Sequence, residues 1–423
     1  MLIIHVVARG ESVYLISGYY GVSPDRIISD NGLADPEQLA VGQTLVIMDS
    51  PSRHTVAVGE SLYTVAYIHG ISLAHLLQAN PEFTANSVIY PGQVLTIPSR
   101  TMKLGRMEVN GYAMPGTDIG VLYRTFPYLT YLSIFSYAVN PDGSLDTIDD
   151  TAAINAARQS GVAPVMVITN KGFDSDVASA VLYNEQAQEN LLENVLQTLR
   201  TKNYHSLNID FEYVYPSDRQ KYNDFISKMV TVLESYGYRV STALAPKLSA
   251  AQQGLQYFAH DYPSHGALVD RVIIMTYEWG FTYGPPMAVA PLNEVQRVLD
   301  YTVTAIPRRK VLMGIPNYGY DWTLPYTQGT AARVVSNTGA VQLAFDVGAD
   351  IKYDPVSQAP YFNYYDSGGR LHVVWFEDAR SIYAKLQLPA RYGLAGVSYW
   401  TIGRFFPQNW LVLHALYDTV KIL

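Results

Sequence analysis

The chain has no cysteine, few charged residues and no long apolar run. The absence of cysteine excludes disulfide bonds, thiolate metal sites and a cysteine nucleophile. Charged residues make up only 16% of the chain and the net charge is −8. This balance argues against nucleic-acid binding, because neutralising phosphates requires basic patches. No segment reaches the roughly 18 to 20 apolar residues that span a bilayer, so we expect no membrane contact.

The first residues do not have the features of an export signal. The apolar segment Met1–Val7 is short and lacks both a basic region and a small-residue cleavage site, so we expect no secretory signal. Apolar and aromatic residues, by contrast, are abundant. Hydrophobic residues make up 48% of 423 residues, which predicts a folded protein of two or more domains. Tyrosine occurs 34 times, and aromatic rings stack well on sugars, which favours a carbohydrate ligand.

An internal repeat occupies the first hundred residues. The segment His5–Tyr14 aligns with His54–Tyr63 at an offset of 49 residues, and residues 42–47 align with residues 92–97 after one inserted residue. In each copy a β-rich start is followed by Gly-Glu-Ser, in which the serine is a suitable helix N-cap. A second helix and a last strand follow. Each unit is therefore predicted to fold as strand, helix, helix, strand.

These units resemble LysM modules, which bind N-acetylglucosamine in peptidoglycan or chitin. We expect the modules at residues 2–48 and 53–98, with linkers at 51–52 and 99–100. A duplicated structural domain without a ligand is the alternative. The resemblance implies binding at backbone and loop positions after the first strand and before the last helix. The candidate glycan-binding residues are Gly10, Glu11, Ser12 and Asn31 in the first unit and Gly59, Glu60, Ser61 and Asn80 in the second.

From residue 104 onward, apolar runs alternate with amphipathic helical stretches, one of them expected over residues 217–236 with Ser217 as its cap. Eight such runs with helical crossovers predict an α/β fold, a (β/α)₈ TIM barrel over residues 104–423. Residues 322–370 are too many for one crossover helix and predict a small α+β insertion. The expected strands are residues 107–113, 131–137, 165–169, 207–211, 240–245, 272–276, 311–315 and 396–399.

The fourth strand carries alternating polar residues where barrel enzymes place their active sites. Alternation directs Asn208, Asp210 and Glu212 to one face, into the barrel. Polar groups are costly to bury there without a function. Two neighbouring carboxyl groups can hold one proton near neutral pH, as a general acid requires. The alternative is a buried, hydrogen-bonded polar cluster with a structural role.

Aromatic and acidic residues also end three later strands. Several aromatic side chains at the mouth of one barrel indicate a sugar-binding cleft, although a single one is usually part of a core. The candidates at these strand ends are Tyr277, Glu278, Trp279, Tyr318 and Trp400.

Residues 104–423 resemble the family 18 glycoside hydrolases, the chitinase-like barrels. Their fourth strand carries Asp-x-x-Asp-x-Asp-x-Glu. The corresponding residues here are His205, Asn208, Asp210 and Glu212, so the last two positions match. A LysM pair joined to such a barrel resembles the spore cortex-lytic N-acetylglucosaminidases of spore-forming bacteria.

Two further motifs carry the same resemblance. The family's strand-six Met-x-Tyr-Asp appears as Met275–Glu278, and its strand-eight tryptophan, the floor of the −1 sugar site, matches Trp400. Asn208 and Glu278 depart from the family's aspartates. We expect Asn208 to hydrogen-bond Asp210 in place of the missing charge, and the longer Glu278 to reach into the −1 pocket.

The resemblance implies a retaining, substrate-assisted reaction in which the substrate supplies the nucleophile. Glu212 would protonate the glycosidic oxygen and then act as the base toward water. Asp210 would accept a hydrogen bond from the acetamide N–H, and the Tyr277 hydroxyl would orient the acetyl carbonyl. The substrate-binding residues would be Asn208, Trp400, Glu278, Tyr318 and Trp279.

We therefore expect an endo-β-N-acetylglucosaminidase that hydrolyses peptidoglycan, in particular spore cortex fragments during germination. It should need no metal or cofactor and act as a monomer on polymers of N-acetylglucosamine. It should be located in the spore coat and cortex or in the cell wall, without a signal peptide. The alternatives are a chitinase and a non-catalytic, lectin-like wall-binding or coat protein. The retained Glu212 argues against the second.

Overall fold

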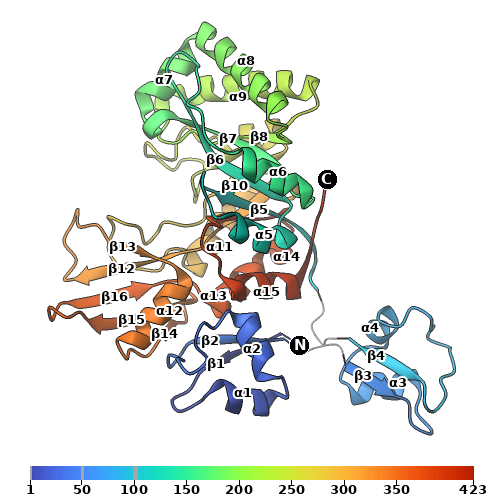
Figure 1. The fold of residues 1–423 in the computed structure, drawn as a ribbon. Coiled ribbons are helices and arrows are strands. Elements are labelled where there is room, and N and C mark those ends of the chain that lie inside the picture. Colours follow the sequence, from blue (N-terminus) through green and yellow to red (C-terminus); the bar gives the residue numbers. More distant parts are fainter. Residues whose placement is uncertain (1, 49–51, 99–102) are drawn as a thin grey trace.

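A computed structural model describes residues 2–48, 52–98 and 103–423, which form two small modules and a barrel with a side lobe (Figure 1). Pro51 and residues 99–100, where linkers were expected, lie outside the described residues. In the described part, every helix is too short or too polar to cross a membrane.

Each of the two modules consists of a pair of antiparallel strands and two helices. The first comprises β1 (Leu2–Val6), α1 (Val13–Tyr20), α2 (Pro24–Asn31) and β2 (Thr44–Met48). The second comprises β3 (Ser52–Thr55), α3 (Leu62–Ile68), α4 (Leu73–Gln78) and β4 (Val94–Ile97). The side chains of Ser12 and Ser61 cap the first helix of each module. The predicted order of strand, helix, helix, strand is confirmed.

The barrel contains eight parallel strands in the described chain, and β17 pairs with β5 to close it. A short strand, β18 (Tyr417–Thr419), continues the sheet beside β5. The predicted barrel is confirmed. Its strands are β5 (Gly105–Ala113), β6 (Tyr131–Val139), β7 (Ala163–Asn170), β8 (Ser206–Ile209), β9 (Arg239–Leu244), β10 (Arg271–Ile274), β11 (Val311–Pro316) and β17 (Gly396–Trp400).

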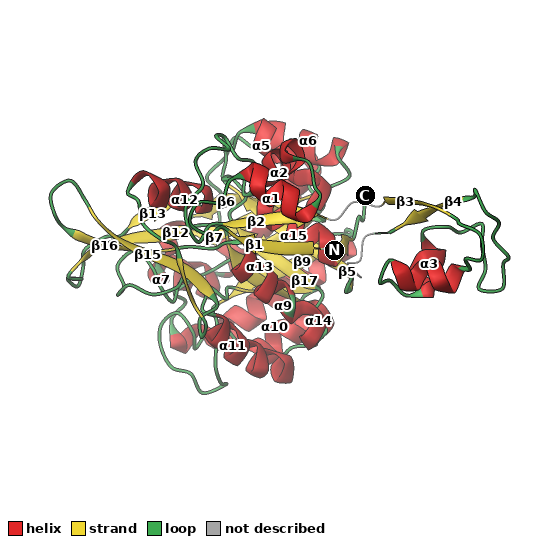
Figure 2. Ribbon diagram, turned by 90° about the horizontal axis from the view of Figure 1, so that it is seen from below, coloured by secondary structure: helices red, strands yellow, loops and turns green. Residues whose placement is uncertain are grey.

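Helices lie around the strands of the barrel (Figure 2). The outward-facing side chains of the strands are buried in the apolar core that the helices share with them. One boundary differs from the prediction. Residues Pro216–Asp218 form a separate 3₁₀ turn, so α9 runs over Arg219–Ser235 and its N-cap position is Asp218, not Ser217. The hydroxyl of Ser217 instead donates to Oδ1 of Asp218, at 2.9 Å. The other surrounding helices are α5 (Ile119–Thr125), α6 (Thr151–Gln159), α7 (Ser175–Tyr183), α8 (Glu185–Thr201), α10 (Tyr262–Leu268), α11 (Leu292–Ala305), α13 (Ala379–Leu386), α14 (Leu388–Tyr392) and α15 (Pro407–Leu416).

The insertion between β11 and β17 is a five-stranded antiparallel sheet with one helix, as its expected α+β character required. Its strands begin three residues before the expected segment and end after it, because β12 follows β11 almost directly. The carboxylate of Asp321 is buried in this lobe, where it accepts hydrogen bonds from Arg333, Tyr364 and His372. The elements are β12 (Gly319–Leu324), β13 (Arg333–Val335), α12 (Asn337–Asp346), β14 (Lys352–Asp354), β15 (Ala359–Tyr365) and β16 (Leu371–Trp375).

The two modules are placed differently. The first packs beneath α13 and α15, and the second stands apart from the barrel in both views (Figures 1 and 2). Val46 of the first module is buried in the same apolar core as the barrel strands. The side-chain amide of Gln408 on α15 donates to the carbonyl of Thr44, at 2.6 Å, and to Oδ1 of Asn31, at 3.1 Å.

Candidate active site

The carboxyl end of β8 places two acidic side chains at the mouth of the barrel. Leu207, Ile209 and Phe211 point outward and are completely buried under the helices. The alternate residues, Asp210 and Glu212, line a pocket of about 480 Å³ at this end of the barrel. The alternation expected from the sequence therefore places both carboxyl groups in one pocket.

The main chain that carries Glu212 is held by the end of the neighbouring strand β7. The amide of Glu212 donates to Oδ1 of Asn170, at 3.0 Å, and the side-chain amide of Asn170 donates back to the carbonyl of Glu212, also at 3.0 Å. Asp210 is fixed by its own amide, which donates to the carbonyl of Ile168. Asn170 was not singled out from the sequence. The sequence could have indicated it, because Asn170 is a polar residue at the carboxyl end of an apolar strand, where barrel enzymes place functional side chains.

Burial raises the proton affinity of both carboxyl groups. Burial raises the pKa of Asp210 well above its usual value, and the nearby Glu212 raises it further. Burial also raises the pKa of Glu212 to about 7, with a smaller contribution from the negative charge of Glu278. In addition, Oδ1 of Asp210 is buried and makes no hydrogen bond within the described residues. The site can therefore hold a proton at neutral pH and leaves one acceptor oxygen available to a ligand.

Tyr277 lies beside this pair in the loop that follows β10. Its ring fits against Gly314 of β11, where an added Cβ would lie 2.7 Å from Cε1 of the ring. Burial raises the pKa of Tyr277 well above its usual value, and the neighbouring carboxylates raise it further. The hydroxyl is therefore neutral and can donate a hydrogen bond into the pocket.

Glu278 is presented by an unusual backbone conformation. Its φ of +70° lies in the left-handed region, which is uncommon for a residue with a side chain and costly unless its surroundings hold it. Here the hydroxyls of Tyr318 and Tyr320 donate to its carboxylate. These hydrogen bonds lower the pKa of Glu278, but burial of the carboxylate has the larger effect and raises it. The residue as a whole remains exposed on the pocket wall.

Aromatic side chains form the floor of the pocket. The ring of Trp400, at the end of β17, lies edge-on to Phe135 and Tyr112, with centroid separations of 4.7 and 5.5 Å. Trp279 lines the wall beside Glu278. Phe135 and Tyr112 were not among the residues expected from the sequence, because they lie inside apolar strand runs and not after them. The pocket is shaped to receive a flat, partly apolar ring such as a sugar.

Asn208 and Tyr318 lie behind the pocket wall and do not line it. The side chain of Asn208 is fully buried, accepts from the Tyr112 hydroxyl at 2.9 Å and donates to Oγ of Ser241 at 2.9 Å. The expectation that Asn208 hydrogen-bonds Asp210 is therefore wrong, because Tyr112 of β5 and Ser241 of β9 occupy the two ends of the amide. Asn208 positions Tyr112, and Tyr318 positions Glu278.

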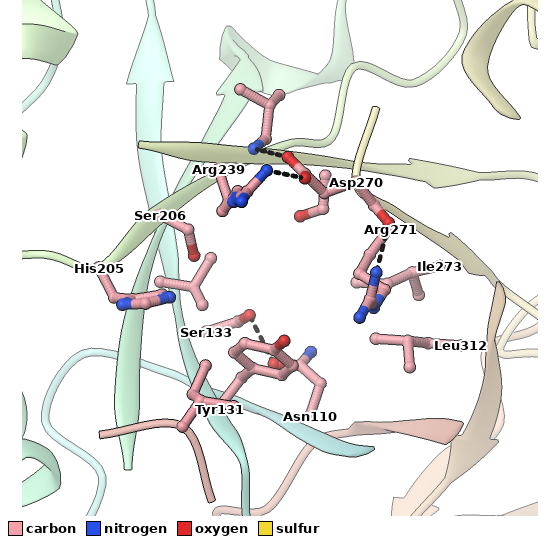
Figure 3. A pocket seen from close by; sticks show the side chains of 14 residues that line it. Asn110, Tyr131, Ser133, His205, Ser206, Arg239, Asp270, Arg271, Ile273 and Leu312 are labelled. Atoms are coloured by element: carbon pink, nitrogen blue, oxygen red, sulfur yellow. Dashed lines mark hydrogen bonds and ion pairs between the residues drawn. The ribbon is translucent and has the colours of Figure 1, made fainter. Parts of the chain in front are cut away.

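A second cavity, of about 370 Å³, lies at the opposite end of the barrel, where the strands begin (Figure 3). His205, the first position of the strand-four motif, lines it, far from the acidic pair. Its charges are paired: Arg239 donates to Asp270 at 2.9 Å, and Arg271 donates to Glu108 at 2.7 Å. Barrel enzymes use the other face for catalysis, so these residues contribute to the stability of the barrel.

The expected glycan-binding residues of the modules have different surroundings. Gly10 and Gly59 are exposed and have positive φ values, of 86° and 84°. Glu11 accepts from the Ala8 amide at 2.7 Å, and Glu60 makes the same bond with Ala57. Ser12 and Ser61 are helix caps.

Asn31 and Asn80 are not available to a glycan. Both are buried, and each donates to a carbonyl of the second helix of its module and to one of the last strand. Each side-chain oxygen accepts from the amide of Val46 or Thr96 on that strand. The expectation that these two side chains bind glycan is therefore wrong. They join the second helix to the sheet in both modules.

Comparison with known proteins identifies both parts of the chain. The sequence profile described as glycosyl hydrolases family 18 matches residues 121–404, and the LysM domain profile matches residues 5–47 and 54–98. The chain is 40% identical to the cortical fragment-lytic enzyme of Bacillus anthracis over 98% of each protein.

Solved structures agree with these matches. The crystal structure of the spore cortex-lytic enzyme SleL of Bacillus megaterium QM B1551 is similar over 100% of this chain and 99% of its own, with a TM-score of 0.88 and 36% identity. A chitinase from Chromobacterium violaceum is similar over 73% of this chain and 98% of its own, with a TM-score of 0.68 and 25% identity.

Proposed function

This chain belongs to the glycosyl hydrolases family 18 and carries two LysM domains, and from that premise we propose that it is a retaining, substrate-assisted endo-β-N-acetylglucosaminidase of peptidoglycan. The observation that carries the proposal is the acidic pair, in which burial raises the pKa of Glu212 to about 7 next to Asp210. A group with this pKa can donate a proton and take it back near neutral pH.

The reaction divides the chemistry between the substrate and three side chains. Glu212 gives its proton to the glycosidic oxygen while the acetamide oxygen of the −1 sugar attacks C1, so the glycosidic bond breaks and an oxazolinium ion forms. Oδ1 of Asp210, which has no hydrogen-bond partner within the described residues, accepts a hydrogen bond from the acetamide N–H. Asp210 thereby stabilises the positive charge of the oxazolinium ion. The Tyr277 hydroxyl donates to the acetyl oxygen. Glu212 then removes a proton from water as the water oxygen attacks C1. The bond between C1 and the acetyl oxygen breaks, and the acetamide is restored.

Spore cortex is the substrate that the relatives favour. Several proteins that this chain matches over almost its full length are called cortical fragment-lytic or spore cortex-lytic enzymes. The mechanism also selects the bond. In muramic lactam the nitrogen is tied into a ring, so its carbonyl cannot reach C1. N-acetylglucosamine therefore occupies the −1 site, stacked on Trp400, and becomes the new reducing end.

Chitin is the second candidate substrate, because it also places N-acetylglucosamine at −1. The likeness to the Chromobacterium violaceum chitinase over the barrel supports it. The two substrates differ in the sugars that flank the −1 site. In cortex these sugars carry a bulky lactyl group that the cleft must accommodate, and in chitin they do not.

The proposal is tested by Glu212→Gln, which keeps the shape of the side chain but removes the proton. Loss of general acid catalysis should lower turnover of soluble cortex fragments by at least about a hundredfold, while the fragments still bind. Glu193→Gln, on the exposed face of α8, is the matched control and should retain full activity. Hydrolysis by Glu212→Gln at the wild-type rate would disprove the assignment.

A further inference from the structure

Each module has a face formed by two loops, the loop after its first strand and the loop before its last strand. This face has different surroundings in the two modules. In the second module, three apolar side chains on that face are exposed: Val58 is 88% exposed, Val88 70% and Tyr90 63%. Val58 lies in the loop after β3, and the other two lie before β4. Hydrogen bonds from Val56 to Gln93 and from Gly92 to Val56 hold these loops side by side. Exposed aromatic and aliphatic side chains on adjacent loops suit the apolar face and acetyl methyl of an amino sugar.

The equivalent positions of the first module are identified by their hydrogen bonds. The amide of Ala40 donates to Oε1 of Gln43 at 3.0 Å, and the amide of Tyr90 makes the same bond with Gln93 at 2.7 Å. Ala40 therefore corresponds to Tyr90. By the same alignment, the counterparts of Val58 and Val88 are Arg9 and Gln38.

All three counterparts contact the inserted lobe of the barrel. Ala40 is 3% exposed and packs in the apolar core of that lobe. Arg9 pairs with Asp350 at 3.1 Å, and Gln38 accepts from Gln342 at 3.1 Å.

The main chain of the first module is occupied as well. Ile351 of the lobe donates its amide to the carbonyl of Val41, at 2.8 Å. A Cβ on Gly42 would lie 2.0 Å from the carbonyl oxygen of Ile351, whereas a Cβ on Gly92 would meet nothing within 4 Å. The segment 350–351 thus lies across both loops of the first module, and the same loops of the second module are open.

We propose that the second module alone binds the glycan strand, on the face formed by Val58, Val88 and Tyr90, and that the first module is a support that joins the chain to the barrel. This proposal rests on the proposed function for the identity of its ligand, a strand of N-acetylglucosamine-containing peptidoglycan. The duplicated face is used in both copies, by the protein itself in the first and by glycan in the second.

The test compares two double variants of the full chain, one on this face of each module, and both carry Glu212→Gln so that the ligand is not cleaved. Val58→Ala with Tyr90→Ala should weaken binding to insoluble cortex sacculi by at least about fivefold, because an aromatic contact is lost. Arg9→Ala with Gln38→Ala, at the positions of the first module that correspond to Val58 and Val88, should change it by less than about twofold, because only exposed polar contacts are lost. Equal weakening by the two pairs, or none by the first pair, would overturn the proposal.

A second measurement does not depend on the variants folding correctly. Titration of the ¹⁵N-labelled Glu212→Gln chain with N-acetylglucosamine oligomers should shift the amide signals of residues 58–61 and 88–92. The signals of residues 9–12 and 40–42 should not move, and their movement would contradict the proposal. Hydrolysis of soluble fragments by the wild-type chain is measured separately. If that hydrolysis is absent, the proposed function fails while the binding comparison still decides between the modules.

Discussion

Glu278 influences catalysis through the proton on Glu212. Burial is the larger cause of the rise in the pKa of Glu212 from 4.5 to about 7, and the negative charge of Glu278 is the second. Replacing Glu278 with glutamine removes the charge and leaves the burial. Less than half of the rise should therefore be lost, and the pKa of Glu212 should fall by at most about one pH unit, to no lower than about 6.

The sign of the effect follows from the role of Glu212. A general acid must carry its proton, so kcat/KM falls as the pH rises through the pKa of that acid. The alkaline limb of the profile should lie near pH 7 in the wild type and move toward lower pH in Glu278→Gln. The measurement is kcat/KM for hydrolysis of a soluble cortex fragment across the pH range, with Glu193→Gln as the control. An alkaline limb that stays in place, or moves to higher pH, would refute the reasoning.

Two further predictions concern the acetamide contacts and the first module. Asp210→Asn and Tyr277→Phe should each lower kcat more than they raise KM, because their contacts strengthen in the transition state, and steady-state kinetics showing a change in KM alone would indicate simple substrate binding. Deleting residues 1–100 should lower the melting temperature of the barrel, because Val46 packs in its core, whereas deleting only residues 52–98 should not; equal melting temperatures in a calorimetric scan would contradict the docking of the first module.

The sequence was informative where a local period determines the structure. Alternation along β8 correctly placed Asp210 and Glu212 on one side of the strand, and the apolar runs identified the barrel. The partners of Asn208 could not be predicted this way, because Ser241 meets it through the register of β8 with β9 and Tyr112 reaches it from β5, which is not adjacent to β8.

The repeat misled the prediction for the modules for a related reason. Asn31 and Asn80 align between the copies, which suggested a shared ligand, but the alignment reflects a shared buried contact with the last strand. The copies are also similar in sequence but differ in surroundings. The contacts that cover the first module come from residues more than 300 positions away, such as Asp350 and Gln342, and local patterns do not record them.

The identity of the new reducing end tests the central claim most directly. Cortex peptidoglycan would be digested with the wild-type chain, the products reduced with borohydride, and the reduced end sugar identified by mass spectrometry. Because the mechanism needs a free acetamide beneath C1, we expect every new end to be N-acetylglucosamine, recovered as its alditol. Products that end in muramic acid or its lactam would contradict this expectation.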